Sequence, residues 1–331
     1  MKERGVVPSD GSPPKKNPDT VHVLIAFTDP YLIPALVLVY QIHRTSSRVV
    51  NLYCYVSERE TSQSAQRIFV AYCTKLGLKV ELKTAAEDHL GSPSGHIASL
   101  SWSRLMPEIW ETDLCWLDLD LLLKRGWDSV FDLLPRLDER APFAMATDKV
   151  PKKRLSNTQN MARLSAGANY GNAGVLLLSY RNWISSKMPA RLLKARAREE
   201  ELGFEFADQC ALNYVSGGKQ LVLPERYNSL GQSVDSSEIL IHHFAGPFKP
   251  WLRQHRHKSM KDKHGSAAVK WRFAQFQMLR GLGRIGVDID PHSWSDLSLE
   301  TFIRNEGKWL AARVRKWPGH LWRALAPSLT R

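Results

Sequence analysis

The sequence is poor in cysteine, with four in 331 residues. The four lie far apart among apolar residues and form no CxxC pair, which argues against a disulfide framework and against a zinc site. This usage predicts buried, reduced thiols and a cytoplasmic protein. The residues concerned are Cys54, Cys73, Cys115 and Cys210.

The sequence also has no uninterrupted apolar run long enough to span a membrane. Its most hydrophobic window, Val21–Tyr40, contains Asp29 and two prolines and has no signal-peptide layout, so it predicts a strand, a loop and a helix. We find no internal repeat, no known nucleic-acid-binding motif and no glycine-rich nucleotide loop near the first predicted strand. The last absence argues against a nucleotidyltransferase.

Positive charge is present in excess, but it is concentrated at one end. The formal net charge is +13, and residues 247–331 carry 17 Lys and Arg against 6 Asp and Glu, a local net charge of +11. The same segment holds six of the eleven tryptophans: Trp251, Trp271, Trp294, Trp309, Trp317 and Trp322. Interleaved cations and aromatic rings favour an anionic partner such as a membrane surface, although such a stripe also occurs on core-facing helices. The near-neutral remainder argues against a nucleic-acid groove.

Apolar runs alternate with amphipathic stretches, which predicts an α/β fold. The expected strands are His22–Phe27, Val49–Val56, Lys79–Leu82, Leu114–Leu117, Pro142–Ala146, Ala173–Ser179 and Ile239–His243. The expected helices are Ile33–Thr45, Thr61–Leu76, Ser99–Trp110, Arg181–Glu201, Asp208–Val215, Ala267–Leu279, Leu299–Lys316 and Gly319–Leu325. Between these elements, residues 149–168 lose apolar periodicity and predict an active-site loop.

Three units follow from this pattern. Residues 1–20 are rich in Pro, Ser, Gly and Lys and predict a disordered leader. Residues 21–251 form the predicted catalytic domain. Residues 252–331 form a basic, Trp-rich, mainly helical C-terminal region.

Four segments contain residues suited to chemistry, and each has a simpler interpretation. Asp118 and Asp120 follow an apolar strand in the sequence LDLD, where they could hold a divalent cation or be solvated turn residues. In HFAGPFKPW, an imidazole and a lysine flank a Gly-Pro loop, which suits a metal and a phosphate or merely ends a strand. Small residues in NYGNAGVLLLSYRNW could admit a sugar or form a tight turn. In FADQCALNYV, Asp208 could cap a helix or face a substrate.

In their order and spacing, these segments, with HVLIAFTDPY and SWSRLMPEIW, resemble glycosyltransferase family 8 over about residues 22–251. The family contains retaining nucleotide-sugar transferases, including bacterial lipopolysaccharide galactosyl- and glucosyltransferases. The resemblance implies a GT-A fold, which is Rossmann-like and binds a UDP-sugar and a metal at the carboxyl ends of its strands. The basic tail would be a helical appendage to it.

The resemblance also implies roles for individual residues. Asp118, Asp120 and His243 would bind Mn²⁺, with Mg²⁺ as the alternative ion. His243 is preferred to His242 because only it has the H-x-x-G-x-x-K-P-W spacing. The implied catalytic residues are Asp208 and Gln209. The implied substrate-binding residues are Thr28, Asp29, Tyr31, Arg104, Asp118, Asp148, Asn172, Ala173, Asp208, Gln209, Gly246 and Lys249. The sequence departs from the family pattern at Thr28–Pro30 and at Gly171.

The predicted function is therefore metal-dependent, retaining transfer of a hexose, galactose or glucose, from a UDP-sugar to a glycan or lipid-linked saccharide. The expected location is the cytoplasm, with peripheral attachment to the inner face of the cell membrane through the tail as a further hypothesis. Two alternatives stay open: an inactive sugar-nucleotide-binding homologue and a basic nucleic-acid-binding protein.

Overall fold

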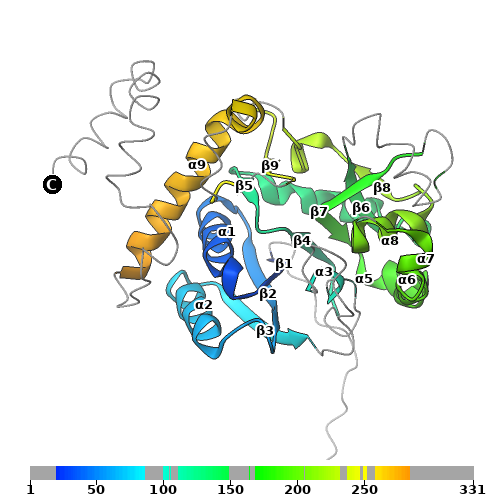
Figure 1. Cartoon of the computed structure of the whole chain (residues 1–331), viewed down its shortest axis with the longest axis horizontal. Helices are drawn as coiled ribbons and strands as arrows, with labels where there is room; N and C mark the ends of the chain where they lie inside the picture. The colour runs from blue at the N-terminus through cyan, green and yellow to red at the C-terminus, as the bar shows by residue number, and fades with distance from the viewer. Residues whose placement is uncertain are drawn as a thin grey trace, which may run out of the picture.

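The fold is built on a seven-stranded mixed sheet, described here from a computed structural model (Figure 1). The structure describes residues 20–85, 100–103, 105, 111–148, 164, 168–204, 206–231, 237–246, 249–251 and 258–283. Statements about the structure refer to these residues.

One half of the sheet is parallel. β1 (Thr20–Phe27) lies between β2 (Val49–Ser57) and β4 (Leu114–Leu117), and β2 pairs with β3 (Lys79–Ala85). β1, β2 and β4 are rich in β-branched and aromatic residues and largely apolar, as expected for parallel strands covered on both faces, whereas the edge strand β3 (KVELKTA) is more polar. α1 (Leu32–Thr45) and α2 (Gln63–Lys75) provide the crossovers between β1, β2 and β3.

The other half of the sheet contains antiparallel pairs. β7 (Gly171–Leu178) runs antiparallel to both β4 and β6 (Phe143–Thr147), and β8 (Leu221–Leu223) is parallel to β6. The full strand order is β3-β2-β1-β4-β7-β6-β8. The chain runs outward from β1 to β3 and returns to the other side of β1 as β4. The order therefore reverses between β1 and β4, and ligands of open α/β sheets bind at the carboxyl ends of strands at such a point.

A second, two-stranded sheet lies beside this reversal point. β5 (Leu121–Leu123) is separated from β4 by three residues and pairs antiparallel with β9 (Ile241–His243). The side-chain amide of Gln41 on α1 bonds β5 twice, along the edge that does not pair with β9: it donates to the Leu121 carbonyl and accepts from the Leu123 amide. This small sheet joins the segment after β4 to a strand more than one hundred residues later.

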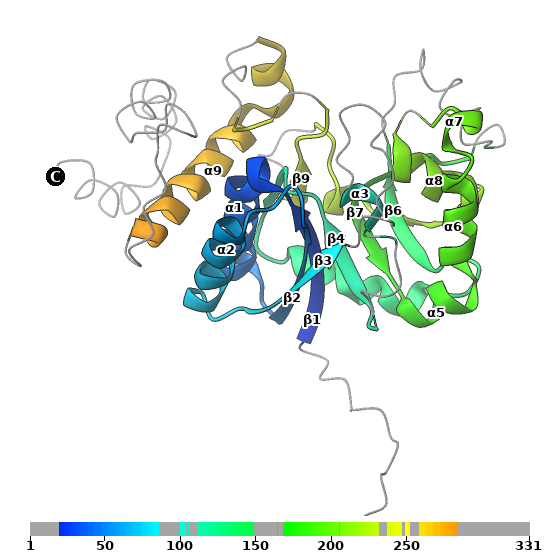
Figure 2. The same cartoon turned by 60° about the horizontal axis from the view of Figure 1, so that its bottom comes forward.

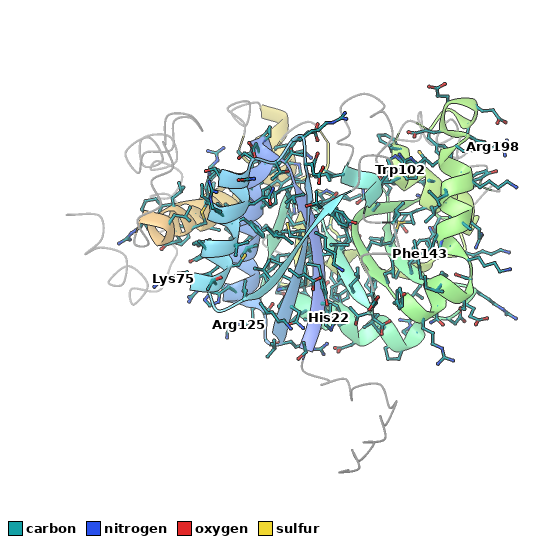
Figure 3. All side chains as sticks on the ribbon, turned by 90° about the horizontal axis from the view of Figure 1, so that it is seen from below. His22, Lys75, Trp102, Arg125, Phe143 and Arg198 are labelled. Atoms are coloured by element: carbon teal, nitrogen blue, oxygen red, sulfur yellow. The ribbon has the colours of Figure 1, made fainter. Side chains whose placement is uncertain are left out.

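Two apolar cores lie on opposite faces of the large sheet. The first packs α1, α2 and α9 (Lys258–Gly283) against the sheet, and the second packs α3 (Leu100–Ser103) and α5 to α8 against the other face (Figure 2). In Figure 3, Trp102 and Phe143 lie on the α5–α8 side, while Lys75 and Arg198 extend from opposite ends of the molecule. The helices on the second face are α5 (Tyr180–Ser185), α6 (Met188–Arg196), α7 (Glu199–Leu202) and α8 (Ala207–Ser216).

α9 runs alongside α1 in Figures 1 and 2 and contributes to the first core. Ala267, Trp271, Met278 and Leu282 are buried there, and the Trp271 ring lies 5.4 Å from that of Trp251. The beginning of the basic C-terminal region is thus packed against the sheet domain through an apolar stripe. The expected helices Leu299–Lys316 and Gly319–Leu325 lie outside the described residues.

The strands agree well with the sequence expectation, and the helices agree less well. The predicted helix Arg181–Glu201 is three short helices, because the backbone of Lys187 is left-handed (φ 56°) and Pro189 begins a new helix. β5, β8 and the 3-10 helices η4 (Trp127–Arg136) and η5 (Glu225–Tyr227) were not expected. Of the expected helix Ser99–Trp110, the structure describes α3 only as far as Ser103.

All four cysteines are buried and free, as their apolar neighbours predict. Burial raises the pKa of the Cys73 thiol to about 12. Within the described residues, no helix is both long and apolar enough to cross a bilayer.

Candidate active site

The two aspartates of LDLD lie in the turn that connects β4 to β5, just beyond the regular strand. Asp118 is held on both sides: its backbone amide donates to the Gly174 carbonyl of β7 (2.9 Å), and its Oδ1 accepts from Nε1 of Trp116 (2.7 Å). Trp116 and Asp118 are two residues apart, so they lie on the same face of the sheet. This bond orients the Asp118 carboxylate at the strand end.

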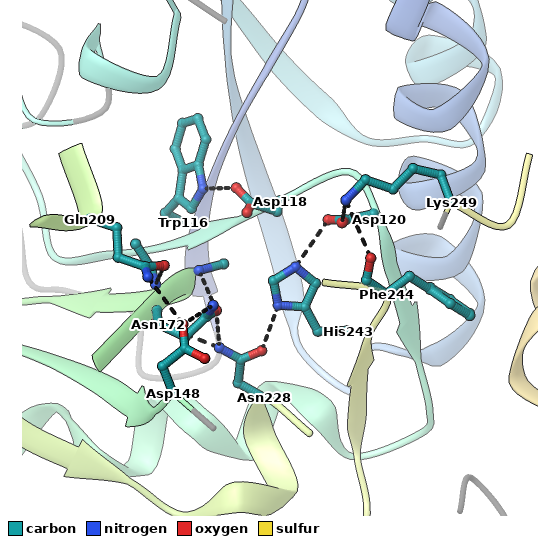
Figure 4. A network of polar contacts seen from close by, with 12 residues as sticks. Trp116, Asp118, Asp120, Asp148, Asn172, Gln209, Asn228, His243, Phe244 and Lys249 are labelled. Atoms are coloured by element: carbon teal, nitrogen blue, oxygen red, sulfur yellow. Dashed lines mark hydrogen bonds and ion pairs between the residues drawn. The ribbon is translucent and has the colours of Figure 1, made fainter. Parts of the chain in front are cut away.

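Asp120 is brought to His243 by the β5–β9 pair. Leu121 pairs with His243, and the Phe244 amide donates to the Asp120 carbonyl (2.9 Å). Nε2 of His243 consequently lies 3.3 Å from Oδ1 of Asp120 (Figure 4). One ligand atom from each of Asp118, Asp120 and His243 lies within 4.8 Å of the others. The three residues predicted to bind a metal are therefore together.

Lys249 completes the charged half of the site. Its ammonium group forms an ion pair with Oδ2 of Asp120 and donates to the Phe244 carbonyl (3.2 Å). Burial alone would raise the pKa of the Asp120 carboxyl, but the charge of Lys249, with a smaller contribution from the His243 ring, outweighs burial and holds that pKa well below its usual range. For Lys249, burial would lower the pKa of the ammonium group, yet Asp120 raises it above its ordinary value. Both groups are charged at neutral pH.

Gly174 explains how the imidazole fits against β7. A Cβ atom built at this position would lie 2.2 Å from Cε1 of His243. Such a contact is far inside the van der Waals separation, so only glycine lets the ring lie against the strand. The space beside Gly174 is filled by the imidazole ring of His243 on β9. Neither sequence-based interpretation of this segment, a place for a sugar or a tight turn, included this role of Gly174.

The other half of the site is a network of side-chain amides around the carboxylate of Asp148. Nδ2 of Asn172 and Nε2 of Gln209 both donate to Oδ2 of Asp148, at 3.2 and 3.1 Å (Figure 4). Oε1 of Gln209 accepts from the Ala173 amide (3.1 Å). The four residues come from the end of β6, the start of β7 and the first turn of α8. They were predicted to bind substrate, and the structure joins them in one cluster.

Asp208 and Gln209 differ in their exposure. Asp208 is the second residue of α8 and only 2% exposed, while Gln209 is partly exposed and reaches the amide network. The N-cap position belongs to Phe206, so the interpretation of Asp208 as the N-cap residue is wrong. The two adjacent residues therefore differ in their surroundings: Asp208 is buried, and the side-chain amide of Gln209 joins the cluster around Asp148.

The residues expected at the nucleobase and ribose follow β1. Thr28 is buried, and Asp29 accepts the Ser62 amide at Oδ1 (2.8 Å), which ties η1 (Asp29–Tyr31) to the start of α2. The Tyr31 ring is 39% exposed and meets the Trp251 ring edge-on at 6.3 Å. One carboxylate oxygen of Asp29 is therefore engaged by the backbone of Ser62. Of these three residues, Tyr31 is the one that exposes an aromatic ring.

The remaining predicted positions are less informative. Gly246 lies three residues after β9 with φ of 100°, a conformation that favours glycine. Arg104 and most of the expected active-site loop, residues 149–163 and 165–167, lie outside the described residues.

Sequence reasoning missed Asn228, which connects the two halves of the site. Asn228 is 1% exposed and follows η5. Its Oδ1 lies 2.9 Å from Nδ1 of His243, and its Nδ2 donates to Oδ1 of Asn172 at 2.9 Å. No local pattern marks it, because its partners come from β7 and β9. Trp116 and Tyr170, whose hydroxyl accepts from Nε2 of Gln209 at 3.4 Å, were missed for the same reason.

The donor set suits a divalent cation. Two carboxylates and one imidazole provide hard and borderline ligands of the kind that bind Mn²⁺ or Mg²⁺. The nearest atoms of Asp120 and His243 would repel one another if both were unprotonated acceptors 3.3 Å apart, and a cation between them removes that repulsion.

A mixed sheet with an Asp-Asp-His cluster at its reversal point fits the GT-A fold. Several solved structures share this fold. The galactosyltransferase LgtC, solved with donor and acceptor sugar analogues, has a TM-score of 0.64 and 17% identity over 83% of this chain and 99% of that one. The glycosyltransferase GlyE of Streptococcus pneumoniae has a TM-score of 0.56 and 19% identity over 81% of this chain and 65% of that one. Mouse xyloside xylosyltransferase 1 has a TM-score of 0.51 and 16% identity over 69% of this chain and 99% of that one.

The chain belongs to glycosyltransferase family 8, whose family model matches residues 22–255. It is a glycosyltransferase by family and by fold. The sequence has no significant match among curated proteins.

Proposed function

We propose that this glycosyltransferase moves a hexose, galactose or glucose, from a UDP-sugar to a glycan or lipid-linked saccharide acceptor, with retention of anomeric configuration and dependence on Mn²⁺. The observation that carries the proposal is the contact between two unlike groups at the end of β4. A charged cluster, Asp118, Asp120, His243 and Lys249, adjoins an amide cluster built on Asp148.

The charged cluster suits a diphosphate leaving group. A divalent cation held by Asp118, Asp120 and His243 would neutralise the negative charge that develops on the departing phosphate. Lys249 forms an ion pair with Asp120, one of these three residues. When it exchanges its partner Asp120 for phosphate oxygens, it stabilises the same charge. Ammonium and carboxylate stay ionised at neutral pH, so this exchange needs no proton transfer.

The amide cluster suits a sugar. Hydroxyl groups both donate and accept hydrogen bonds, and Asp148, Asn172 and Gln209 provide carboxylate and amide groups of both kinds. Gln209 and Asp208 are the residues we assign to the reacting sugar. Retention can arise through a covalent intermediate on a side chain or through attack on the same face as the leaving phosphate, and in both routes a polar group beside the anomeric carbon stabilises positive charge there.

The tail carries the membrane part of the proposal. Residues 284–331 contain four of the eleven tryptophans and lie outside the described residues. Their basic, aromatic composition supports attachment to an anionic membrane surface. Binding of the purified chain to anionic vesicles, compared with a chain ending at Gly283, tests this part separately from catalysis.

The catalytic proposal is tested by measuring UDP release from UDP-galactose and UDP-glucose, with and without a saccharide acceptor. We expect release with Mn²⁺ and none with EDTA. Nucleotide-sugar binding without release under any of these conditions would favour an inactive sugar-nucleotide-binding homologue.

A further inference from the structure

We propose that Asn228 is a positioning residue that fixes His243 with its proton on Nδ1 and so leaves Nε2 free to bind the metal. The consequence for metal binding rests on the proposed function. The protonation of Nδ1 rests only on the hydrogen-bond chain shown in Figure 4.

The direction of this chain starts at a group that can only donate. The backbone amide of Gly174 donates to Oδ1 of Asn172 at 3.0 Å, so that atom is the carbonyl oxygen of the side chain. The other end of Asn172 gives the same answer, because its Nδ2 faces Oδ2 of Asp148, which as a carboxylate can only accept. Two independent partners thus fix the orientation of the Asn172 amide.

The orientation of Asn228 follows from that of Asn172. The Asn228 side chain has one end 2.9 Å from Oδ1 of Asn172, an acceptor. Only the NH2 end of Asn228 can donate to it, so Oδ1 of Asn228 points the other way, toward Nδ1 of His243 at 2.9 Å. A carbonyl oxygen can only accept, so Nδ1 carries a proton.

The other ring nitrogen is the one that faces the carboxylates. Nε2 of His243 lies 3.3 Å from Oδ1 of Asp120. Among the described residues, His243 is the one histidine in the group that could hold a metal. A metal-bound histidine commonly donates its other N–H to an oxygen, which fixes the tautomer and the orientation of the ring. Burial strengthens this control, because Asn228 is 1% and His243 4% exposed and water does not compete for the bond.

The same chain links metal binding to the sugar side. Removing the Asn228 amide breaks the bond to His243 and the bond to Asn172 together, and Asn172 in turn bonds Asp148. Asn228 therefore couples the position of the metal ligand to that of the residues assigned to the donor sugar.

The experiment measures the protonation of the ring directly. Protein labelled with ¹⁵N-histidine is examined by long-range ¹H–¹⁵N correlation, with the His243 signals assigned by their loss in His243→Ala. In metal-free protein we expect a proton on Nδ1, and on adding Mg²⁺ a shift of the Nε2 resonance with Nδ1 still protonated. An unprotonated Nδ1 in metal-free protein overturns the proposal. A protonated Nδ1 with no response to Mg²⁺ or Mn²⁺ leaves it standing and overturns the metal site instead.

Two substitutions test the role of Asn228 itself. In Asn228→Leu we expect the His243 proton to be no longer confined to Nδ1 and Mn²⁺ binding to weaken by about 10- to 100-fold. Mn²⁺ binding is measured from the electron paramagnetic resonance signal of free Mn²⁺. Asn228→Asp keeps an acceptor opposite Nδ1, and we expect it to keep the Nδ1 proton and most of the Mn²⁺ affinity while losing the bond to Asn172. It also serves if the leucine variant does not fold.

The matched control is Asn182→Leu. Asn182 on α5 also makes side-chain bonds, to the Leu137 carbonyl and Oγ of Ser179, on an element remote from the metal ligands. Its replacement should leave both the His243 spectrum and the Mn²⁺ affinity unchanged. Equal loss of affinity in Asn182→Leu and Asn228→Leu, or full affinity with an unchanged ring in Asn228→Leu, would reduce Asn228 to a structural residue and overturn the proposal.

Discussion

The two halves of the site stabilise their side chains in different ways. The half that contains Asp118, Asp120, His243 and Lys249 is held by charge, and one buried carboxylate there is 6% exposed and paired with a cation. The half that contains Asp148, Asn172 and Gln209 is held by directional amide bonds around one carboxylate. A charged group stabilises an anionic leaving group with little dependence on its shape, whereas amide groups form directional hydrogen bonds that depend on where the hydroxyl groups lie. The difference suggests that chemistry and sugar selection are separated within one site.

The largest effect is expected from breaking the charged half. Asp120→Ala and His243→Ala each remove a metal ligand, and we expect Mn²⁺-dependent UDP release and transfer to fall by about a thousandfold or more. Steady-state UDP release measures this effect, and circular dichroism checks that the fold is retained. Asp132→Ala removes an exposed carboxylate paired with Arg48 and is the control. Full activity in either ligand variant would remove the proposed metal site.

The next prediction concerns Asp208, the neighbour of Gln209 on α8. In Asp208→Asn we expect turnover to fall by about a hundredfold while UDP binding changes much less, because the substitution affects the sugar rather than the diphosphate. Turnover and UDP affinity are measured separately, by UDP release and by calorimetry. An unchanged turnover would mean that Asp208 has only a structural role in α8.

The contact between the halves is tested at Gly174. In Gly174→Ala the new methyl group would meet the His243 ring, and we expect Mn²⁺ affinity to fall about tenfold or more and stability by about 1–3 kcal/mol. Metal titration and thermal unfolding measure the two effects. Gly283→Ala, where no atom lies within 4 Å of the new Cβ, should change neither. Normal Mn²⁺ affinity in Gly174→Ala would show that the ring has room to move.

A smaller effect is expected on stability when Lys249 is replaced by Met. The pKa of Asp120 in the folded protein is below its unfolded value, so this carboxylate adds stability at pH above the unfolded pKa and loses it as pH falls toward the folded pKa. Lys249→Met removes a main cause of that shift. The variant should therefore be less stable than the wild type at pH 7, and the difference in Tm should shrink as pH falls from 7 toward 3. A difference that grows on acidification contradicts the assigned ion pair.

The elements and ligands that sequence could predict are those with a local signal. β1, β2 and β4 are apolar runs of β-branched and aromatic residues, and LDLD and H-x-x-G-x-x-K-P-W are compact motifs. β5 and β8 have three residues each, too few for a periodic pattern, and the break at Lys187 depends on a left-handed residue that its sequence does not mark.

The residues that sequence could not predict depend on tertiary contacts. Asn228 gains its role because β7 and β9 bring Asn172 and His243 to its two ends. Gly174 reads as a turn residue until the His243 ring is found against it. The sequence of α9 indicates part of a basic tail. That its apolar residues are buried follows only from its packing against α1.

The central claim is that the charged half binds a metal together with the diphosphate of a uridine nucleotide sugar. It is tested most directly by thermal unfolding of the full chain with UDP, GDP, UDP-galactose, UDP-glucose and GDP-mannose, each with and without Mn²⁺. A ligand that binds the native state raises Tm, and at a fixed ligand concentration the rise grows with the logarithm of the affinity. The account predicts that a UDP-sugar raises Tm only when Mn²⁺ is present, and that this shift is lost in Asp120→Ala. An equal rise without metal, or a rise with GDP-mannose alone, would contradict it.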